Sequence, residues 1–320
     1  MIEPTMNISV IMPCYTAKVG AYVKDAVSSV LKQKGDFLIR EIIVVDENEP
    51  GTTGALGDTL DSGIVKVIPN DGSRNAAGAR NTGLKIATGE WIAFMDADDL
   101  LLDNSMSVRC DAAHRFPDCR WIGADFYWMK EDGNPEAETF YSTRSIPKRY
   151  FAEAFATGQP IRLHRPVVPF LQACLSKIGA NLIGRDLLDK VGPTDPELKM
   201  AEDHQLYMRM AAISDYVFVP KPALYYRRHP MNTTAAVESG GEAPGTWTYK
   251  ALNLLLVRYG MQAYRHDIHA QMAQFALGDS YFYRKNHDFY AGAKWAAQAI
   301  KFDPGCGAAW RSLTASLLGR

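Results

Sequence analysis

One apolar run that ends in acids constrains the fold of this chain more than any other feature. Five apolar residues, 91–95, lead directly into Asp96, Asp98 and Asp99. A short run of this kind is typical of a buried strand in a parallel sheet, and ligands bind at the carboxyl ends of such strands. Carboxylates two positions apart on an extended chain point the same way, so Asp96 and Asp98 are candidate ligands of one divalent cation. The alternative is that the acids cap a helix that begins at Leu100, and Asp99 is the acid for which we expect this role rather than that of a ligand.

The residues on the N-terminal side of this run alternate between strand and helix patterns. Apolar and β-branched runs predict strands at 8–12, 41–46 and 64–68, and helical spacing predicts helices at 21–33 and 78–88. We therefore expect an α/β fold with a Rossmann-like, mostly parallel central sheet flanked by helices. Tyr15, Asp46 and Asp96 then follow neighbouring strands, which is the layout of a nucleotide site. The chain has no G-x-G-x-x-G after its first strand and no P-loop, so the usual dinucleotide and P-loop classes are excluded.

The composition is that of an ordinary soluble protein, since 47% of the 320 residues are hydrophobic and 22% are charged. A formal net charge of −1 gives no reason to expect a nucleic acid partner. The five cysteines are odd in number and no pair has C-x-x-C spacing, which predicts free thiols rather than a zinc site. There is no signal-peptide pattern and no apolar run of about 18 residues. We expect a cytoplasmic protein that touches at most the cytoplasmic face of a membrane.

Seven short segments occur in a recognisable order within residues 6–235. They are SVIMPCY at 9–15, IVVD at 43–46, NDG at 70–72, ARNTG at 79–83, GEWIAFMDADD at 89–99, ED at 202–203 with Leu206 and Arg209, and YRRH at 226–229. In this order they resemble the family 2 glycosyltransferases of the GT-A fold. The resemblance implies transfer of a sugar from a nucleotide-diphosphate sugar, with a UDP-sugar as the expected donor.

The resemblance also implies roles for individual residues. It places the nucleotide on Pro13, Tyr15, Asp46, Arg80 and Asp96. It places Mn²⁺ or Mg²⁺ on Asp98, Asp96 and His229. Each role has a plain structural alternative: core packing for Tyr15, a surface helix charge for Arg80 and a surface side chain for His229.

Glu202 and Asp203 are the candidates for the catalytic base. They precede Leu206 and Met210, whose spacing predicts a helix, and acids at a helix start commonly just complement the helix dipole. The resemblance instead implies that Asp203 is the general base, with Glu202 second, and that Arg209 is a structural ion-pair partner. One base and no carboxylate nucleophile imply a single displacement that inverts the anomeric configuration.

The chain divides by pattern into three parts. We expect a GT-A domain over 1–237, with a nucleotide half at about 1–103 and an acceptor half at about 104–237, then a Gly- and Pro-containing linker at 238–247. The tail at 248–320 is helical in pattern, and residues 277–304 resemble one tetratricopeptide repeat. Because a single repeat cannot bury its own face, the tail is expected to dock on the catalytic domain, in a homodimer, or on a partner.

The predicted function is an inverting, metal-dependent step in the synthesis of surface polysaccharide, lipopolysaccharide or another glycan, with a glycan or lipid-linked acceptor. Two alternatives stay open: a polyprenyl-phosphate glycosyltransferase, and a degenerate GT-A domain whose helical tail serves as a protein-interaction module. A basic run between 144 and 165 is interpreted as a solvated face, with an anionic membrane or a lipid-diphosphate acceptor as the alternative partner.

Overall fold

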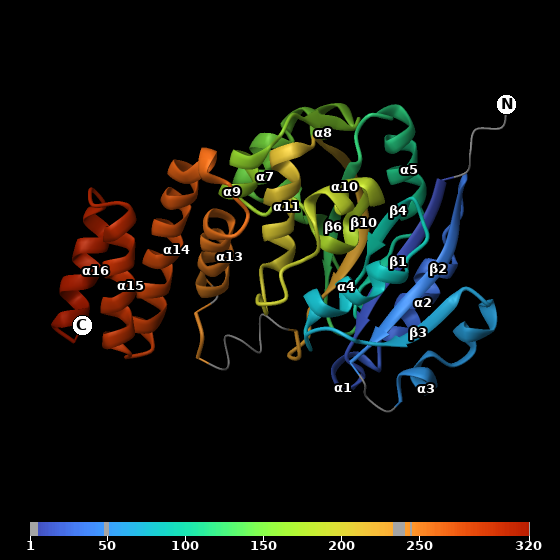
Figure 1. The fold of residues 1–320 in the computed structure, drawn as a ribbon, viewed down its shortest axis with the longest axis horizontal. Helices are drawn as coiled ribbons and strands as arrows, with labels where there is room; N and C mark the ends of the chain where they lie inside the picture. The colour runs from blue at the N-terminus through green and yellow to red at the C-terminus, as the bar shows by residue number, and fades with distance from the viewer. Residues whose placement is uncertain (1–5, 48–50, 233–240, 244, 320) are drawn as a thin grey trace. The chain divides into compact units, whose positions relative to one another are not determined.

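The computed structural model describes residues 6–47, 51–232, 241–243 and 245–319, and the chain forms two compact units (Figure 1). The first unit holds Met1–Glu197 and Leu206–His229, and the second holds Leu198–Gln205 and Pro230–Arg320. The second unit therefore includes a short segment from the middle of the predicted catalytic domain. The predicted linker at 238–247 lies partly outside the described residues, and its last three residues begin a helix.

Four parallel strands form the first part of the sheet, as the alternating sequence pattern predicts. They are β1 (Met6–Cys14), β2 (Phe37–Asp46), β3 (Val65–Pro69) and β4 (Trp91–Phe94), in the order β3-β2-β1-β4. The connecting helices are α1 (Thr16–Val19), α2 (Val23–Leu31), α3 (Thr52–Leu56) and α4 (Ala76–Ile86). The apolar run that precedes Asp96 therefore forms β4, a buried strand paired with β1.

The rest of the sheet is mixed in direction. Its strands are β5 (Leu100–Leu101), β6 (Trp121–Met129), β7 (Pro135–Thr139), β8 (Ile161–Leu163), β9 (Asn181–Gly184) and β10 (Tyr216–Arg227). The order continues β4-β9-β6-β10-β5, with β7 paired to β6 and β8 paired to β10. β9 runs antiparallel to both β4 and β6, a feature that the alternation in the first half of the sequence does not predict.

Helices cover the sheet of the first unit (Figure 1). Beyond β4 they are α5 (Ser105–Arg115), α6 (Phe140–Thr143), α7 (Ser145–Tyr150), α8 (Ala152–Thr157), α9 (Val167–Gln172), α10 (Arg185–Val191) and α11 (Glu202–Ile213). α4 packs against β1 and β2, while α5 packs against β6 and β10. Gly83 allows α4 to pack closely on β1 and β2, because a Cβ at this position would collide with Ile11 and press on Val45.

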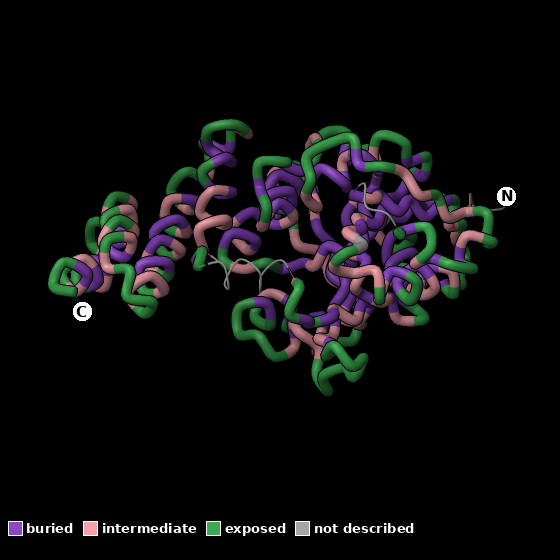
Figure 2. The backbone as a smooth tube through the Cα atoms, turned by 90° about the horizontal axis from the view of Figure 1, so that it is seen from below, coloured by how far each residue is buried: buried purple, intermediate pink, exposed green. Residues whose placement is uncertain are grey.

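Buried residues follow the strands of this sheet (Figure 2). Around Trp121 the core is aromatic: its ring stacks on Tyr207 at 5.7 Å between centroids and packs against Phe170 at 4.8 Å. All five cysteines are free, as their spacing predicts. None of the described helices is long and apolar enough to cross a membrane.

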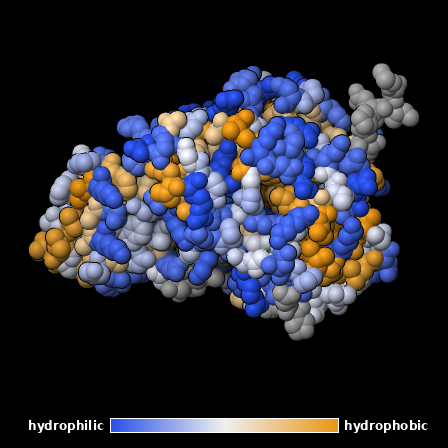
Figure 3. Space-filling view, in the orientation of Figure 1, coloured by the Kyte–Doolittle hydropathy of each residue, from blue (hydrophilic) through white to orange (hydrophobic). Residues whose placement is uncertain are grey.

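The second unit is helical, as the sequence predicts for the tail. Its helices are α13 (Gly245–Val257), α14 (Arg265–Lys285), α15 (Phe289–Phe302) and α16 (Gly307–Leu317), each packed on the next. Small residues form a core between the last three, namely Ala276, Ala299 and Ala309. Apolar side chains also gather on the surface of the last helices (Figure 3), where Tyr290 is 84% and Leu317 is 74% exposed. The likeness to a tetratricopeptide repeat and pairing with a second copy stay predictions.

Candidate active site

The carboxyl ends of β2, β1 and β4 lie side by side at one edge of the sheet. Cys14, the last residue of β1, is level with Asp46, the last residue of β2. On the other side β1 pairs with β4, and the chain beyond β4 leads directly to Asp96. Tyr15 follows β1, and Pro13 lies within it. The structure therefore brings the predicted nucleotide residues to a common edge, as parallel strands require.

A buried ion pair joins two of the predicted nucleotide residues. The Arg80 guanidinium donates to Asp96 at 2.7 Å, and the Arg80 side chain is only 3% exposed. Burial disfavours the charged form of Asp96, but the positive charges of Arg80 and Lys177 outweigh it and hold the pKa of Asp96 below its usual value. Arg80 is thus not a surface helix charge. Its direct partner is the first acid of the D-x-D motif.

Asp98 and His229 meet, although they lie 131 positions apart in the sequence. The His229 Nε2 atom is 2.9 Å from Asp98 Oδ2, and the two side chains are 2% and 14% exposed. The ring of Tyr22 packs against His229, with centroids 5.2 Å apart. His229 is therefore a buried side chain beside an acid, which contradicts the alternative of a surface histidine.

A carboxylate and an imidazole that converge in this way fit a divalent cation in their chemistry. Within the described part of the chain, no group of three or more His, Cys, Asp or Glu side chains could hold a metal. Asp98 and His229 could therefore supply only part of a coordination shell. Diphosphate and water oxygens commonly complete such a shell around Mg²⁺ or Mn²⁺.

The expectation that Asp99 caps a helix beginning at Leu100 is wrong. Leu100 and Leu101 form the short strand β5, and α5 starts only at Ser105. Asp99 is fully buried, and its Oδ1 atom accepts a hydrogen bond from the Arg227 backbone N–H at 3.0 Å. Burial, together with the charges of Asp98 and Asp96, raises the pKa of Asp99 well above its usual range. Asp99 therefore fastens the D-x-D loop to the end of β10.

Arg227 is a second clamp on this loop. Its Nε donates to the Asp98 carbonyl at 2.9 Å and its Nη1 donates to the Glu131 carbonyl at 3.1 Å. Its guanidinium also lies 4.5 Å from the centre of the Tyr22 ring. In the structure its role is to hold the backbone that presents Asp98.

Lys177 is the charged residue at this edge that sequence reasoning missed. Its ammonium lies 3.8 Å from the centre of the Tyr226 ring, and its charge acts on Asp96 and Asp99. Lys177 lies four residues before β9, the antiparallel strand that pairs with β4. No motif marks Lys177, so only the tertiary structure could have found it.

The candidate base residues begin a helix, as predicted. Glu202 and Asp203 are the first residues of α11, and the Asp203 carboxylate accepts a hydrogen bond from the His204 backbone N–H at 2.7 Å. Both residues belong to the second compact unit. Arg209 is structural: it donates to the carbonyls of Val191 and Pro193 at 3.0 and 2.8 Å. The assignment of Asp203 as base stays a prediction.

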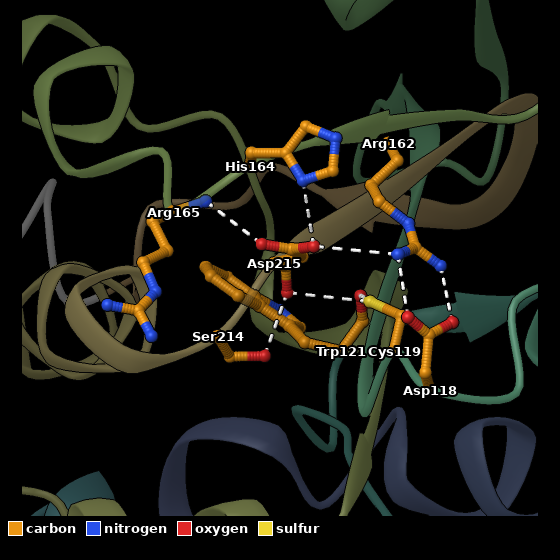
Figure 4. A network of polar contacts seen from close by, with 8 residues as sticks. All are labelled: Asp118, Cys119, Trp121, Arg162, His164, Arg165, Ser214 and Asp215. Carbon is orange, nitrogen blue, oxygen red and sulfur yellow. Dashed lines mark hydrogen bonds and ion pairs between the residues drawn. The ribbon is translucent and has the colours of Figure 1, made fainter.

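Part of the basic run is neutralised within the first unit (Figure 4). Arg162 contacts the carboxylates of Asp118 and Asp215, at 2.7 Å and 3.6 Å. The His164 ring and the Arg165 backbone N–H approach the Asp215 carboxylate at 3.0 and 3.2 Å. These contacts favour a solvated, self-paired face over a free anion-binding patch at residues 162–165.

Comparison with known proteins finds similarity to glycosyltransferases. Residues 9–161 match the family profile described as Glycosyl transferase family 2. The Escherichia coli protein WfgD, a UDP-Glc:alpha-D-GlcNAc-diphosphoundecaprenol beta-1,3-glucosyltransferase, is 35% identical over 102 residues. That match covers 32% of this chain and 39% of WfgD. The chain thus spans well under half of this curated relative.

Two further proteins match over nearly the whole chain. An uncharacterized glycosyltransferase of Nostoc sp. is 26% identical, over 93% of this chain and 94% of that protein. The crystal structure of Staphylococcus aureus TarS 1-349 in complex with UDP-GlcNAc has a TM-score of 0.60 and 15% identity. That similarity covers 98% of this chain and 93% of the TarS chain, and it shows that the two proteins share a fold.

Proposed function

We propose that this protein is an inverting, metal-dependent glycosyltransferase that moves a sugar from a UDP-sugar to an acceptor hydroxyl. One observation carries the proposal: Asp98 and His229 meet at 2.9 Å beside the Arg80–Asp96 pair, at the sheet edge where Asp46 and Tyr15 also lie. The match of residues 9–161 to the family 2 profile supports the same class. The Mn²⁺ or Mg²⁺ requirement, the donor and the stereochemistry belong to the proposal.

The residues at this edge suit a nucleoside diphosphate. Asp46, held at its Oδ1 by the Thr52 hydroxyl at 2.9 Å, could accept the N–H of a uracil ring, and Tyr15 offers an aromatic face to the base. Asp98 and His229 would hold the divalent cation, with help from Asp96. When bound, such a cation supplies Lewis-acid stabilisation of the departing diphosphate.

The acceptor hydroxyl needs a base, because its pKa lies far above neutrality. In the proposed step the acceptor oxygen attacks the anomeric carbon while the bond from that carbon to the diphosphate oxygen breaks. UDP leaves with the bonding electrons, and the hydroxyl proton passes to the Asp203 carboxylate. Glu202 is the second candidate for this base. A single displacement turns an α-linked donor into a β-linked product.

The acceptor is proposed to be a glycan or a lipid-linked sugar of a surface polysaccharide pathway. This class rests on relatives such as WfgD, whose name specifies a diphosphoundecaprenol-linked acceptor. A GalNAc(5)-diNAcBac-PP-undecaprenol beta-1,3-glucosyltransferase of Campylobacter jejuni is also 32% identical over 121 residues. The exposed basic residues of α7, Lys148 and Arg149, could contact an anionic membrane that carries such an acceptor.

The test is a panel of UDP-sugars with Mn²⁺, with released UDP and glycoside as the measured products. We expect Asp98→Ala to lower the rate at least about 100-fold while the protein stays folded, because the site loses a ligand of the cation that would stabilise the departing diphosphate. The matched control is Asp189→Ala, because the Asp189 side chain is 60% exposed and pairs with Arg185. Substantial Mn²⁺-dependent activity in Asp98→Ala would contradict the metal assignment.

The stereochemistry and the base are tested separately. NMR coupling constants should show a β-linked product from an α-linked donor, and an α-linked product would rule out the single displacement. Asp203→Asn should lower kcat about 100- to 10,000-fold and leave UDP binding intact. A domain that has lost its catalytic function would show no Mn²⁺-dependent thermal shift with UDP.

A further inference from the structure

A short segment of the predicted catalytic domain folds with the C-terminal helices instead. Residues Leu198–Gln205 belong to the same compact unit as Pro230–Arg320, although they lie between two parts of the first unit in the sequence. This segment carries Glu202 and Asp203. The part of the chain that bears the proposed base therefore belongs to the same compact unit as the helical tail.

An apolar cluster ties the segment to α13. Leu198 is fully buried and packs with Ala251 and Leu254, which are 0% and 7% exposed. Trp247 and Tyr259 cover the same cluster. Next to it, the Lys199 ammonium lies 5.6 Å from the centre of the Trp247 ring. Leu198 and Lys199 thus both contact α13. We infer that these contacts hold the backbone just before Glu202 in place.

The backbone that leads into the base is held in an uncommon conformation. Ala201 has φ +63°, in the left-handed region that costs free energy for a residue with a Cβ. Ala201 packs against the same apolar cluster. Its carbonyl accepts the hydrogen bond from Gln205 at 2.9 Å, which is the bond that opens α11. A conformation of this kind persists only where surrounding contacts enforce it, and here α13 provides those contacts.

We propose that the C-terminal helices position the catalytic base, with Leu198 and Leu254 as positioning residues that fix the backbone of 198–203. The inference rests on the proposed role of Asp203. It assigns the tail a part in the transfer step itself, whether or not the tail also binds a partner.

The test compares Leu254→Ala with Leu317→Ala in the full chain. Leu317 is 74% exposed, so its truncation removes a leucine of the same unit without opening the cluster. We expect Leu254→Ala to lower kcat at least tenfold, because small displacements of a catalytic group cost large factors in rate. The donor KM and the affinity for UDP should stay within twofold. Leu254→Met should restore most of kcat, since it refills the space.

Hydrogen exchange of the amides at 198–205 gives a measurement independent of activity. It should speed up in Leu254→Ala and stay unchanged in Leu317→Ala. If Leu254→Ala does not fold, Leu254→Val makes the same comparison with a smaller cavity. Faster exchange with an unchanged kcat would overturn the inference, and so would an equal loss of UDP binding and kcat.

A different result would rule out the assignment of Asp203 as the base. Normal transfer by Asp203→Asn would remove Asp203 from the mechanism, whatever Leu254→Ala does. Loss of transfer in Asp203→Asn with full kcat in Leu254→Ala would leave the base in place and overturn only the positioning role.

Discussion

At the scale of single residues, the balance of charge around the D-x-D loop decides what the site can bind. Asp96 is paired with Arg80, Asp98 contacts His229, and Asp99 is buried against the backbone of β10. Lys177, four residues before β9, adds a positive charge that acts on Asp96 and Asp99. The positive charge of Lys177 would therefore lower the affinity of this site for a divalent cation.

We expect Lys177→Met to bind Mn²⁺ about three- to tenfold more tightly than wild type in the absence of nucleotide. The reason is that removal of a like charge near a cation site lowers the electrostatic cost of binding. The free Mn²⁺ signal in electron paramagnetic resonance measures this affinity. Lys177→Arg should behave as wild type, and Lys148→Met, at an exposed position of α7, is the matched control. Unchanged or weaker Mn²⁺ binding by Lys177→Met would show that its charge does not act on the metal.

At the scale of elements, one buried carboxylate connects three strands with the segment that leads into a fourth. Glu41 of β2 accepts hydrogen bonds from Ser9 of β1 at 2.8 Å and from the backbone of Thr88, just before β4, at 2.7 Å. It also pairs with Lys66 of β3 at 2.6 Å, and its side chain is only 1% exposed. Burial alone would raise its pKa, but these bonds outweigh burial and lower the pKa of Glu41 to about 2.

Glu41→Gln should destabilise the first unit at neutral pH by about 3 kcal/mol, because a pKa below its ordinary value means that folding favours the charged form. This contribution is complete above pH about 4.5 and is lost as the pH falls toward 2. Urea unfolding of wild type and Glu41→Gln across this range measures it. Asp58→Asn, which breaks an exposed pair with Lys24, should change nothing measurable. A constant difference between Glu41→Gln and wild type down to pH 2 would contradict the assignment.

At the scale of the whole molecule, the two units do not follow the order of the sequence. The predicted boundary at 237 falls near the end of the first unit at His229, yet Leu198–Gln205 belongs to the second.

A buried acid also gives the second unit a pH dependence of its own. Asp279 of α14 accepts from the Thr246 hydroxyl at 2.9 Å near the start of α13, and burial raises its pKa to about 6.

The second unit should therefore lose stability as the pH rises from about 4 to 6, by up to roughly 3 kcal/mol. The sign is opposite to that of Glu41, because a raised pKa means that the folded state prefers the proton. Hydrogen exchange of α13 amides against pH measures the effect. Asp279→Asn keeps an acceptor oxygen but cannot ionise, so it should flatten the profile. An unchanged profile in Asp279→Asn would assign the pH dependence to another group.

Much of the first half of the fold and of its site is predictable from local pattern. The strands that end near Cys14, Asp46 and Phe94 and the helix that carries Arg80 form where hydrophobic spacing places them. Parallel strands bring their carboxyl ends to one edge by geometry alone, so the cluster of Tyr15, Asp46 and Asp96 needs no further information. The role expected for Asp99 is wrong because the hydrogen-bond partner of its carboxylate comes from the distant strand β10.

The remaining features depend on contacts between residues far apart in the sequence, which a periodic pattern does not encode. The charge of Lys177, from the segment before β9, acts on Asp96 and Asp99, and the segment after β10 brings His229 to Asp98. In the second unit, α13 buries Leu198 beside the segment that bears Asp203. The sequence by itself determined the class of fold, the common sheet edge of Tyr15, Asp46 and Asp96, and the candidate acids, because these follow from local periodicity and strand direction. Only the tertiary structure decided which charges and which helix support those acids, because burial and pairing are properties of the packed chain.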